Sequence, residues 1–230
     1  MKRKELLQKD QFLTMSGRII HHIETQSKYY GLGLLALILT VLSVLGWSTY
    51  QNHREKKASD AYFLTLKQID EARVGKKESK DIKLEDLQKP ISSLKDVVDK
   101  YASTVSGVLA SLKLGNLYYE YKQFDQAMLY FKKAKKYAKD KTLLFNALYN
   151  VAYAHESLGQ YEEAKNSFEE LSFADVEFWA LSGYLGKGRC FEKLGHVDKA
   201  KEAYESLKQK YPQYQQKAEE YLLLMSYEKK

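Results

Sequence analysis

The chain carries few side chains of the kind that do catalytic chemistry, and their spacing forms no known catalytic arrangement. Its 230 residues include five histidines and a single cysteine, Cys190. A zinc hydrolase of the H-E-x-x-H type and a thiol redox enzyme of the C-x-x-C type are therefore excluded. His21 and His22 are adjacent, so on a helix they point about 100° apart and form a poor metal pair. We predict no catalytic residue, no metal site and no cofactor.

The sequence also lacks the motifs of phosphate-binding and acyl-transfer enzymes. The sequence has no Walker loop, no glycine-rich phosphate loop and no G-x-S-x-G. Both His155 and Cys190 lie in repeat helices, where a buried structural role is expected. The carboxylates occur in runs such as Glu162-Glu163, which indicate solvated faces and local ion pairs.

The charge balance does not favour nucleic acid as a partner. Lysine and arginine number 37 and aspartate and glutamate 30, which leaves a net charge of +7. The two signs are interspersed along most of the chain, as on an ordinary solvated helical surface. No arginine-rich run, zinc spacing or RNP-like aromatic motif is present.

One segment is too apolar to remain in water. Residues 31–47 read GLGLLALILTVLSVLGW and contain no charge. With their flanks they form a stretch, residues 29–50, of about the twenty residues that cross a hydrocarbon core as a helix. Tyrosines at one end and Trp47 with Tyr50 at the other match the aromatic belts of two membrane interfaces. We predict a single transmembrane helix over residues 29–50.

A cleaved signal peptide is the alternative interpretation of this segment. Residues 1–28 precede the apolar core, which is long for the charged region of a signal peptide, and the small-residue cleavage pattern is weak. An uncleaved anchor is favoured. Six lysines and arginines before the span against four just after it place the N-terminal segment in the cytoplasm. The C-terminal domain is then expected on the opposite side.

Residues 51–107 are predicted to connect the span to the repeats. Residues 47–73 contain neither proline nor glycine, so the helix is expected to run on beyond the span. Residues 75–83 are polar and lack periodicity, which indicates a loop. A second helix is expected over about residues 91–101. Together these elements resemble a degenerate first hairpin.

A short sequence motif, referred to below as the phrase, occurs three times in the second half of the chain. Each copy ends on an alanine (Ala127, Ala164 and Ala200) and is followed four residues later by an aromatic residue. The alanines are 37 and 36 residues apart. This is the spacing of helical-hairpin repeats, which stack into a solenoid.

The residues around this phrase resemble the tetratricopeptide repeat. Frames that begin at Val108, Phe145 and Leu181 reproduce its order of large, small and large residues, then alanine, then an aromatic. Lys187 departs from the pattern at a large-residue position of the third copy. The resemblance implies an all-α solenoid that follows the single membrane helix.

The repeats set the expected boundaries of the C-terminal part. Residues 108–212 are predicted to form three repeats and residues 213–230 a C-terminal capping helix. Gly159 and Gly195 lie where two of the hairpins turn, at positions that require a positive φ or tight closure.

The same resemblance nominates a binding face. In tetratricopeptide proteins, the concave face comes mainly from positions 2, 5, 9, 12 and 13 of each first helix. A clamp for a C-terminal carboxylate requires a lysine where this chain has Leu112, so such a clamp is not expected. The implied face is apolar and aromatic, as suits extended polypeptide. Its candidate protein-binding residues are Leu109, Leu112, Asn116, Tyr119, Asn146, Tyr149, Tyr153, Glu156, Leu185, Arg189, Glu192 and Lys193.

The combination of one span with such repeats is similar to the YfgM-like family, the ancillary subunit of the SecYEG translocon. The resemblance covers roughly residues 30–212. It implies a bacterial inner-membrane adaptor whose periplasmic repeats contact translocon subunits, chaperones or secreted clients. A structural or regulatory scaffold for an envelope or cell-division complex is the alternative. The residues near the membrane exit that carry the resemblance are Gly46, Trp47, Tyr50, His53, Ala58, Ala61 and Tyr62.

Overall fold

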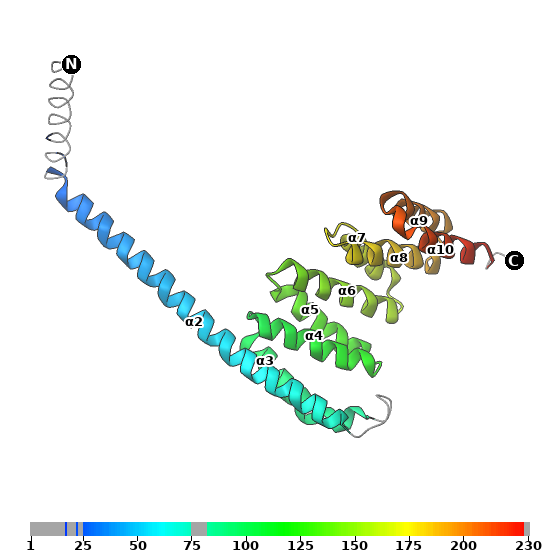
Figure 1. Cartoon of the computed structure of the whole chain (residues 1–230), viewed down its shortest axis with the longest axis horizontal. Coiled ribbons are helices and arrows are strands. Elements are labelled where there is room, and N and C mark those ends of the chain that lie inside the picture. Colours follow the sequence, from blue (N-terminus) through cyan, green and yellow to red (C-terminus); the bar gives the residue numbers. More distant parts are fainter. Residues whose placement is uncertain (1–16, 18–21, 23–24, 75–81, 228–230) are drawn as a thin grey trace, which may run out of the picture. The chain divides into compact units, whose positions relative to one another are not determined.

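The computed structural model describes residues 17, 22, 25–74 and 82–227, and these residues contain helices and no β-strand (Figure 1). The expected all-α class is confirmed. The chain divides into two compact units, Met1–His53 and Arg54–Lys230.

Two sequence predictions fall largely outside this description. Most of the predicted cytoplasmic segment, residues 1–28, lies outside the described residues. So does the predicted loop, apart from residues 82 and 83.

The first unit contains the apolar part of helix α2 (Ser27–Arg73). This helix includes a window of mean hydropathy 2.0 that is 0% buried, and it is long and apolar enough to cross a membrane. The hydroxyls of Thr40 and Ser43 donate to the carbonyls of Ala36 and Leu39, at 2.6 and 2.8 Å. The polar side chains of the apolar stretch are thus satisfied within the helix itself, as a hydrocarbon environment requires.

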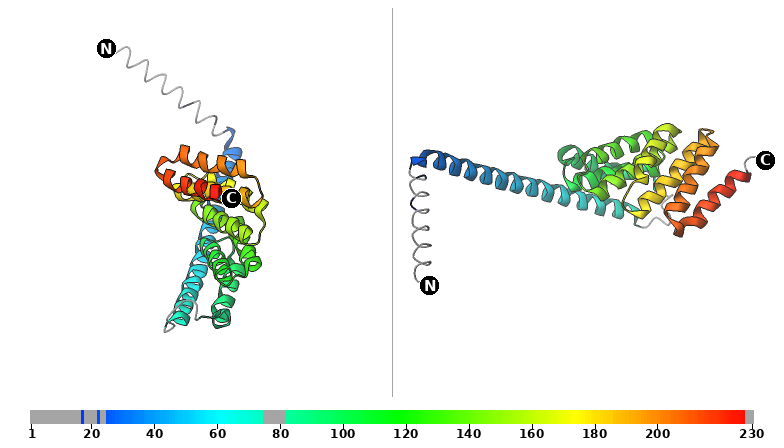
Figure 2. Two further views of the ribbon diagram at one scale, coloured as in Figure 1. Left: turned by 90° about the vertical axis from the view of Figure 1, so that its right-hand side faces the viewer. Right: turned by 90° about the horizontal axis from the view of Figure 1, so that it is seen from above.

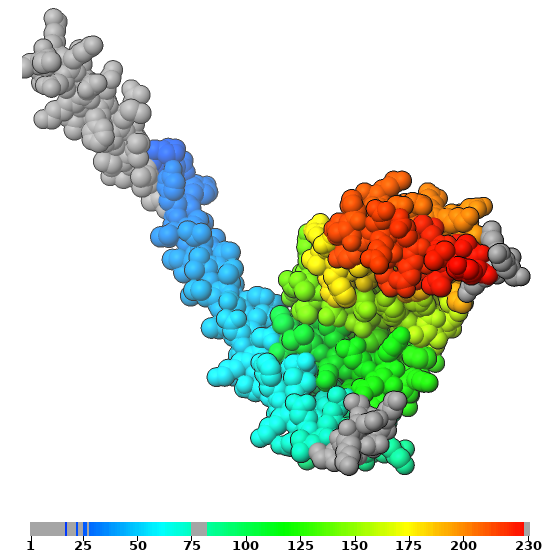
Figure 3. All heavy atoms as spheres, turned by 45° about the vertical axis from the view of Figure 1, so that its right-hand side comes forward, coloured from blue at the N-terminus to red at the C-terminus, as the bar shows by residue number. Residues whose placement is uncertain are grey.

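The second unit is a stack of helical hairpins that follow one another in chain order (Figures 2 and 3). The last turns of α2, from Arg54, pack with α3, and each later helix from α3 to α9 packs against the next. The final helix, α10, packs against α9. The elements after α2 are η2 (Leu84–Leu87), α3 (Gln88–Tyr101), α4 (Val105–Glu120), α5 (Phe124–Tyr137), α6 (Lys141–Ser157), α7 (Tyr161–Ser172), α8 (Glu177–Lys193), α9 (Val197–Lys210), η3 (Pro212–Tyr214) and α10 (Gln215–Tyr227).

The three hairpins α4–α5, α6–α7 and α8–α9 turn in the same way. Lys122, Gly159 and Gly195 adopt positive φ angles of 59°, 73° and 76°. The next residue in each turn donates its N–H to a carbonyl five residues earlier, at 2.8 to 2.9 Å. This bond satisfies a helix-terminal carbonyl that would otherwise lack a partner. The two glycines confirm the sequence prediction, whereas Lys122 adopts the left-handed conformation at a cost of about 1 kcal/mol.

The recurring alanines and aromatics form the core of the hairpins. The three alanines of the phrase are fully buried, and the aromatics that follow them, Phe131, Phe168 and Tyr204, are at most 1% exposed. A Cβ atom at Gly115 would overlap the ring of Phe131, and one at Gly188 would overlap the ring of Tyr204. In the α4–α5 and α8–α9 hairpins, a glycine of the first helix therefore makes room for the aromatic of the second, whereas the ring of Phe168 on α7 is faced by Gly186 of α8. Burial of each ring contributes about 1.5–3 kcal/mol.

The middle of α2, where the second unit begins, is joined to α3 and α4 by charged contacts. Glu55 accepts hydrogen bonds from the backbone N–H groups of Val105 and Ser106, at 2.7 and 3.0 Å. Arg54 donates to the carbonyl of Lys100 near the end of α3, at 2.9 Å. A carboxylate thus meets the positive end of α4 and a guanidinium meets the negative end of α3, which is the favourable arrangement in both cases.

Candidate functional site

The predicted concave positions lie on α4, α6 and α8, and these first helices contact one another along the stack. Asn116 and Lys193 are exposed, whereas Leu112 and Leu185 are only 5% and 8% exposed and belong to the core. The remaining predicted residues are half-buried: Leu109, Tyr119, Asn146, Tyr149, Tyr153, Glu156, Arg189 and Glu192.

At the α4–α6 end of the face, polar side chains bond to one another. The hydroxyls of Tyr119 and Ser157 lie 2.7 Å apart and link α4 to α6. The amide of Asn150 donates to both the carbonyl and the side-chain oxygen of Asn146, each at 2.8 Å. These groups are largely satisfied by each other, so this end offers few free hydrogen-bonding groups.

An aromatic cluster covers the junction of α6 and α8. The rings of Tyr149 and Tyr153 lie 4.5 Å apart, and those of Phe178 and Trp179 lie 5.8 and 5.4 Å from Tyr149. Burial raises the pKa of Tyr149 to about 12, so its hydroxyl stays protonated. Phe178 is 52% exposed and presents an aromatic surface to solvent.

Sequence reasoning missed Phe178 and Trp179. They precede the first position of the third repeat frame, and the family pattern assigns no binding role there. The available signal was the pair of adjacent aromatic residues just before the third repeat frame.

Farther along α8, a charged pair is held against aromatic rings. Arg189 donates two hydrogen bonds to the carboxylate oxygens of Glu156, at 2.9 and 2.8 Å. Its guanidinium lies 5.5 Å from the ring centre of Tyr153 and 5.6 Å from that of Phe168. Burial by itself would lower the pKa of Arg189, but the hydrogen bonds and charge of Glu156 outweigh it and raise that pKa. This pair fixes α8 to α6.

A second polar link joins α8 to α9. The hydroxyl of Tyr204 donates to Glu192 Oε1 at 2.6 Å, and its ring stacks on that of Tyr221 from α10, with centres 5.1 Å apart. Burial raises the pKa of Tyr204, and the bond to Glu192 raises it further. One carboxylate oxygen of Glu192 is therefore occupied by the hydrogen bond from the buried Tyr204.

A groove of about 420 Å³ lies beside these groups, between α8 and α10. Its volume falls in the range of ligand pockets, about 300–1,000 Å³. We call it the α8–α10 groove. It is lined by Glu156, Arg189, Glu192, Lys193, Tyr221, Leu224, Met225 and Tyr227.

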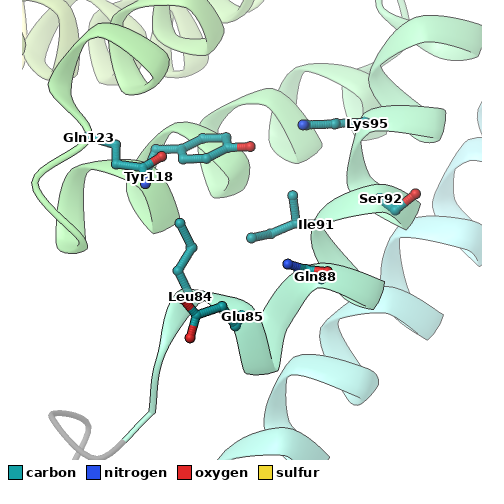
Figure 4. Close-up of a pocket in the computed structure, with 8 residues that line it drawn as sticks. All are labelled: Leu84, Glu85, Gln88, Ile91, Ser92, Lys95, Tyr118 and Gln123. Carbon is teal, nitrogen blue, oxygen red and sulfur yellow. The ribbon is translucent and has the colours of Figure 1, made fainter.

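Another pocket, of about 470 Å³, lies between η2, α3 and the end of α4 (Figure 4). Lys95 points toward the hydroxyl of Tyr118 across this pocket, and this contact raises the pKa of Lys95 above its ordinary value. Leu84 and Ile91 supply its apolar wall. None of its lining residues is among the predicted concave positions.

His155 and Cys190 are structural, as expected. His155 is 7% exposed, and its Nδ1 lies 2.7 Å from Gln160 Oε1. Cys190 is fully buried, and burial raises the pKa of its thiol to about 12. A thiol with this pKa is not a nucleophile near neutral pH. Within residues 25–74 and 82–227, no group of three or more histidine, cysteine, aspartate or glutamate side chains is placed to hold a metal ion.

The geometry of stacked hairpins agrees with a comparison to protein families. The model of the tetratricopeptide repeat-like domain matches residues 25–224. The chain belongs to this family. Repeat-like domains of this kind typically serve as protein-interaction scaffolds.

Two solved structures are similar to part of this chain. A putative kinesin light chain with TPR-like repeats from Podospora anserina is 16% identical, with a TM-score of 0.44; the match covers 53% of this chain and 65% of that one. The MamA protein is 21% identical, with a TM-score of 0.41, and the match covers 54% of this chain and 66% of that one. The match thus spans just under two thirds of the length of each structure. No curated protein matches the chain.

Proposed function

We propose that this protein is a non-enzymatic adaptor, anchored in a membrane by α2, that binds polypeptide on the face formed by α4, α6, α8 and α10. The observation that carries the proposal is the aromatic surface at the α6–α8 junction, where Phe178 is 52% exposed beside Tyr149 and Tyr153. Aromatic residues at accessible positions are typical anchors of protein interfaces. The α8–α10 groove extends this surface toward the end of the stack.

The apolar stretch of α2 supports the anchoring part of the proposal. A helix with a mean hydropathy of 2.0 over its most apolar window suits a bilayer, and Trp47 and Tyr50 stand where an interface is expected. By the distribution of lysine and arginine, the N-terminus lies in the cytoplasm and the repeats in the periplasm of a bacterial inner membrane. Tethering raises the local concentration of the binding face, which helps a weak binder.

The proposed partners are proteins of the export route. Translocon subunits, chaperones or secreted clients are implied by the likeness of the single span and repeats to the YfgM-like family. An apolar, aromatic face suits segments that are still unfolded, because their apolar side chains remain uncovered.

Photocrosslinking in cells tests the binding face. A photoreactive amino acid is placed at Phe178 or at Lys193, and a control at Lys201, an exposed lysine on α9. We expect crosslinks to export components or to many different clients from Phe178 and Lys193, with at least severalfold less from Lys201. Equal crosslinking from the three positions would overturn the proposed face.

The identity of the crosslinked proteins separates the adaptor from the alternative scaffold. Many clients, or translocon subunits, support an adaptor in export. A single stoichiometric partner from an envelope or cell-division complex would instead assign the scaffold role.

A reporter fused after Lys230 tests the orientation. Alkaline phosphatase is active only outside the cytoplasm, so the fusion is expected to show phosphatase activity. A green fluorescent protein that folds only in the cytoplasm serves as the matched fusion and is expected to stay dark. The reverse pattern would place the repeats in the cytoplasm.

A further inference from the structure

The α10 side of the α8–α10 groove is apolar and accessible. Here Leu224 and Tyr227, which line the groove, are 55% and 65% exposed. With the half-buried Tyr221 they form an accessible apolar wall. Such a wall suits the insertion of a bulky apolar side chain.

The opposite wall, on α6 and α8, carries charges that are mostly engaged within the protein. Both carboxylate oxygens of Glu156 accept from Arg189, and Glu192 Oε1 accepts from the buried Tyr204. The Arg189–Glu156 pair is neutral as a unit, whereas Glu192 keeps its negative charge and is held toward α9 by the bond from Tyr204. These three groups already have hydrogen-bonding partners when the groove is empty.

Lys193 differs from its neighbours on this wall. It is exposed, and in the part of the chain that the structure describes it forms no ion pair with a carboxylate. The nearby carboxylates of α10 are already engaged, since Glu219 pairs with Lys208 at 2.9 Å and Glu220 with Lys217 at 2.8 Å. The ammonium of Lys193 therefore leaves room for an acceptor supplied by a ligand.

We infer that the α8–α10 groove selects peptide segments in which a bulky apolar side chain stands next to an aspartate or glutamate. The apolar side chain lies against Leu224 and Tyr227, and the carboxylate pairs with Lys193. This inference rests on the proposed function and specifies the chemistry of the polypeptide that the face accepts. Because Lys193 is exposed, its ion pair with the ligand contributes little free energy. The charge of Lys193 therefore sets the preference between peptide segments, and the apolar contact with α10 supplies most of the affinity.

Peptide binding to the full chain in lipid nanodiscs tests the inference by fluorescence anisotropy. The probes are short labelled peptides of one sequence that differ only in whether aspartate, asparagine or lysine stands beside a central leucine pair. We expect the aspartate peptide to bind about three- to fivefold more tightly than the asparagine peptide, the size of one partly exposed ion pair. The lysine peptide should bind most weakly.

Charge reversal and removal of the apolar wall make the test specific to the groove. Lys193→Glu should reverse the order of the aspartate and lysine peptides, whereas Lys201→Glu, the same change on α9, should leave the order unchanged. Leu224→Ser should weaken the binding of all three peptides about tenfold, as expected when one apolar contact is lost. Because Leu224 and Lys193 are exposed, neither change should disturb folding, which circular dichroism checks.

The possible outcomes separate this inference from the proposed function. If the three peptides bind equally to the unmodified chain, or if Lys193→Glu leaves their order unchanged, charge selection at this groove is overturned while polypeptide binding stands. If no peptide binds and crosslinking from Phe178 is also absent, the proposed function itself fails.

Discussion

Phe168→Ala is expected to lower the free energy of unfolding of the repeats by about 3–5 kcal/mol, the range measured for large buried aromatic residues. Phe168 is fully buried on α7, and its ring occupies the space above Gly186 of α8. The same ring contacts Tyr153 of α6 edge-on, with centres 5.1 Å apart, and lies under the guanidinium of Arg189. Its removal therefore leaves a cavity that three helices share.

Chemical denaturation of the full chain in mild detergent, followed by circular dichroism, measures this loss. Phe173→Ala is the matched control, because Phe173 lies five residues later and is 72% exposed. That change is expected to alter the free energy of unfolding by no more than about 0.5 kcal/mol. Similar losses for the two variants would show that the recurring aromatic is not the centre of the hairpin core.

Arg189→Met is expected to lower the free energy of unfolding by about 2–3 kcal/mol. Removal of one partner of a fully buried ion pair typically costs about 3–5 kcal/mol, because the other charge is left unpaired. The side chains of Arg189 and Glu156 are 24% and 21% exposed, so water partly compensates and the cost falls below that range. The loss should appear in the same denaturation experiment.

A double-mutant cycle isolates the contribution of this pair. Glu156→Gln combined with Arg189→Met should cost about 1–2 kcal/mol less than the sum of the two single changes. The comparison pair is Lys141 and Asp175, which also joins neighbouring hairpins but has side chains 81% and 79% exposed. Loss of that pair should change stability by less than about 1 kcal/mol. Equal coupling in the two pairs would contradict the role of burial.

The repeat core was predictable from the sequence because its signal is local and periodic. An alanine and an aromatic four residues apart lie on one face of a helix, and their return every 36 or 37 residues places them in equivalent hairpins. Ala164 and Phe168 are both fully buried as a result. The turns at Gly159 and Gly195 were predictable for a similar reason, since a positive φ strongly favours glycine.

The exposure of the nominated residues on the first helices was only partly predictable, because it depends on the neighbouring helix. A repeat frame gives the face of a helix on which a residue lies, and it does not give the size of the side chains packed across from it. Leu112 and Leu185 occupy the nominated positions yet are covered. The α8–α10 groove requires the packing of a capping helix that has no repeat pattern, so no frame predicts its lining.

The departure at Lys187 also has a structural reason that the sequence did not reveal. Its ammonium reaches Glu169 Oε1 of α7, at 2.7 Å, and lies 5.9 Å from the ring centre of Phe191. A long lysine stem can cover apolar surface while its charge finds a carboxylate. The position that the family fills with a large apolar residue is thus occupied by a lysine paired with the preceding hairpin.

The common hairpin turn has a consequence for how this chain changes in evolution. Lys122, Gly159 and Gly195 share a left-handed conformation, and the residue after each, which is the N-cap of the second helix, has nearly the same backbone angles in all three turns. Equivalent turns are natural crossover points for recombination. When two gene segments are joined at such turns, the product still encodes a first helix, the same turn and a second helix. Duplication or loss of one such unit would lengthen or shorten the stack by a whole hairpin.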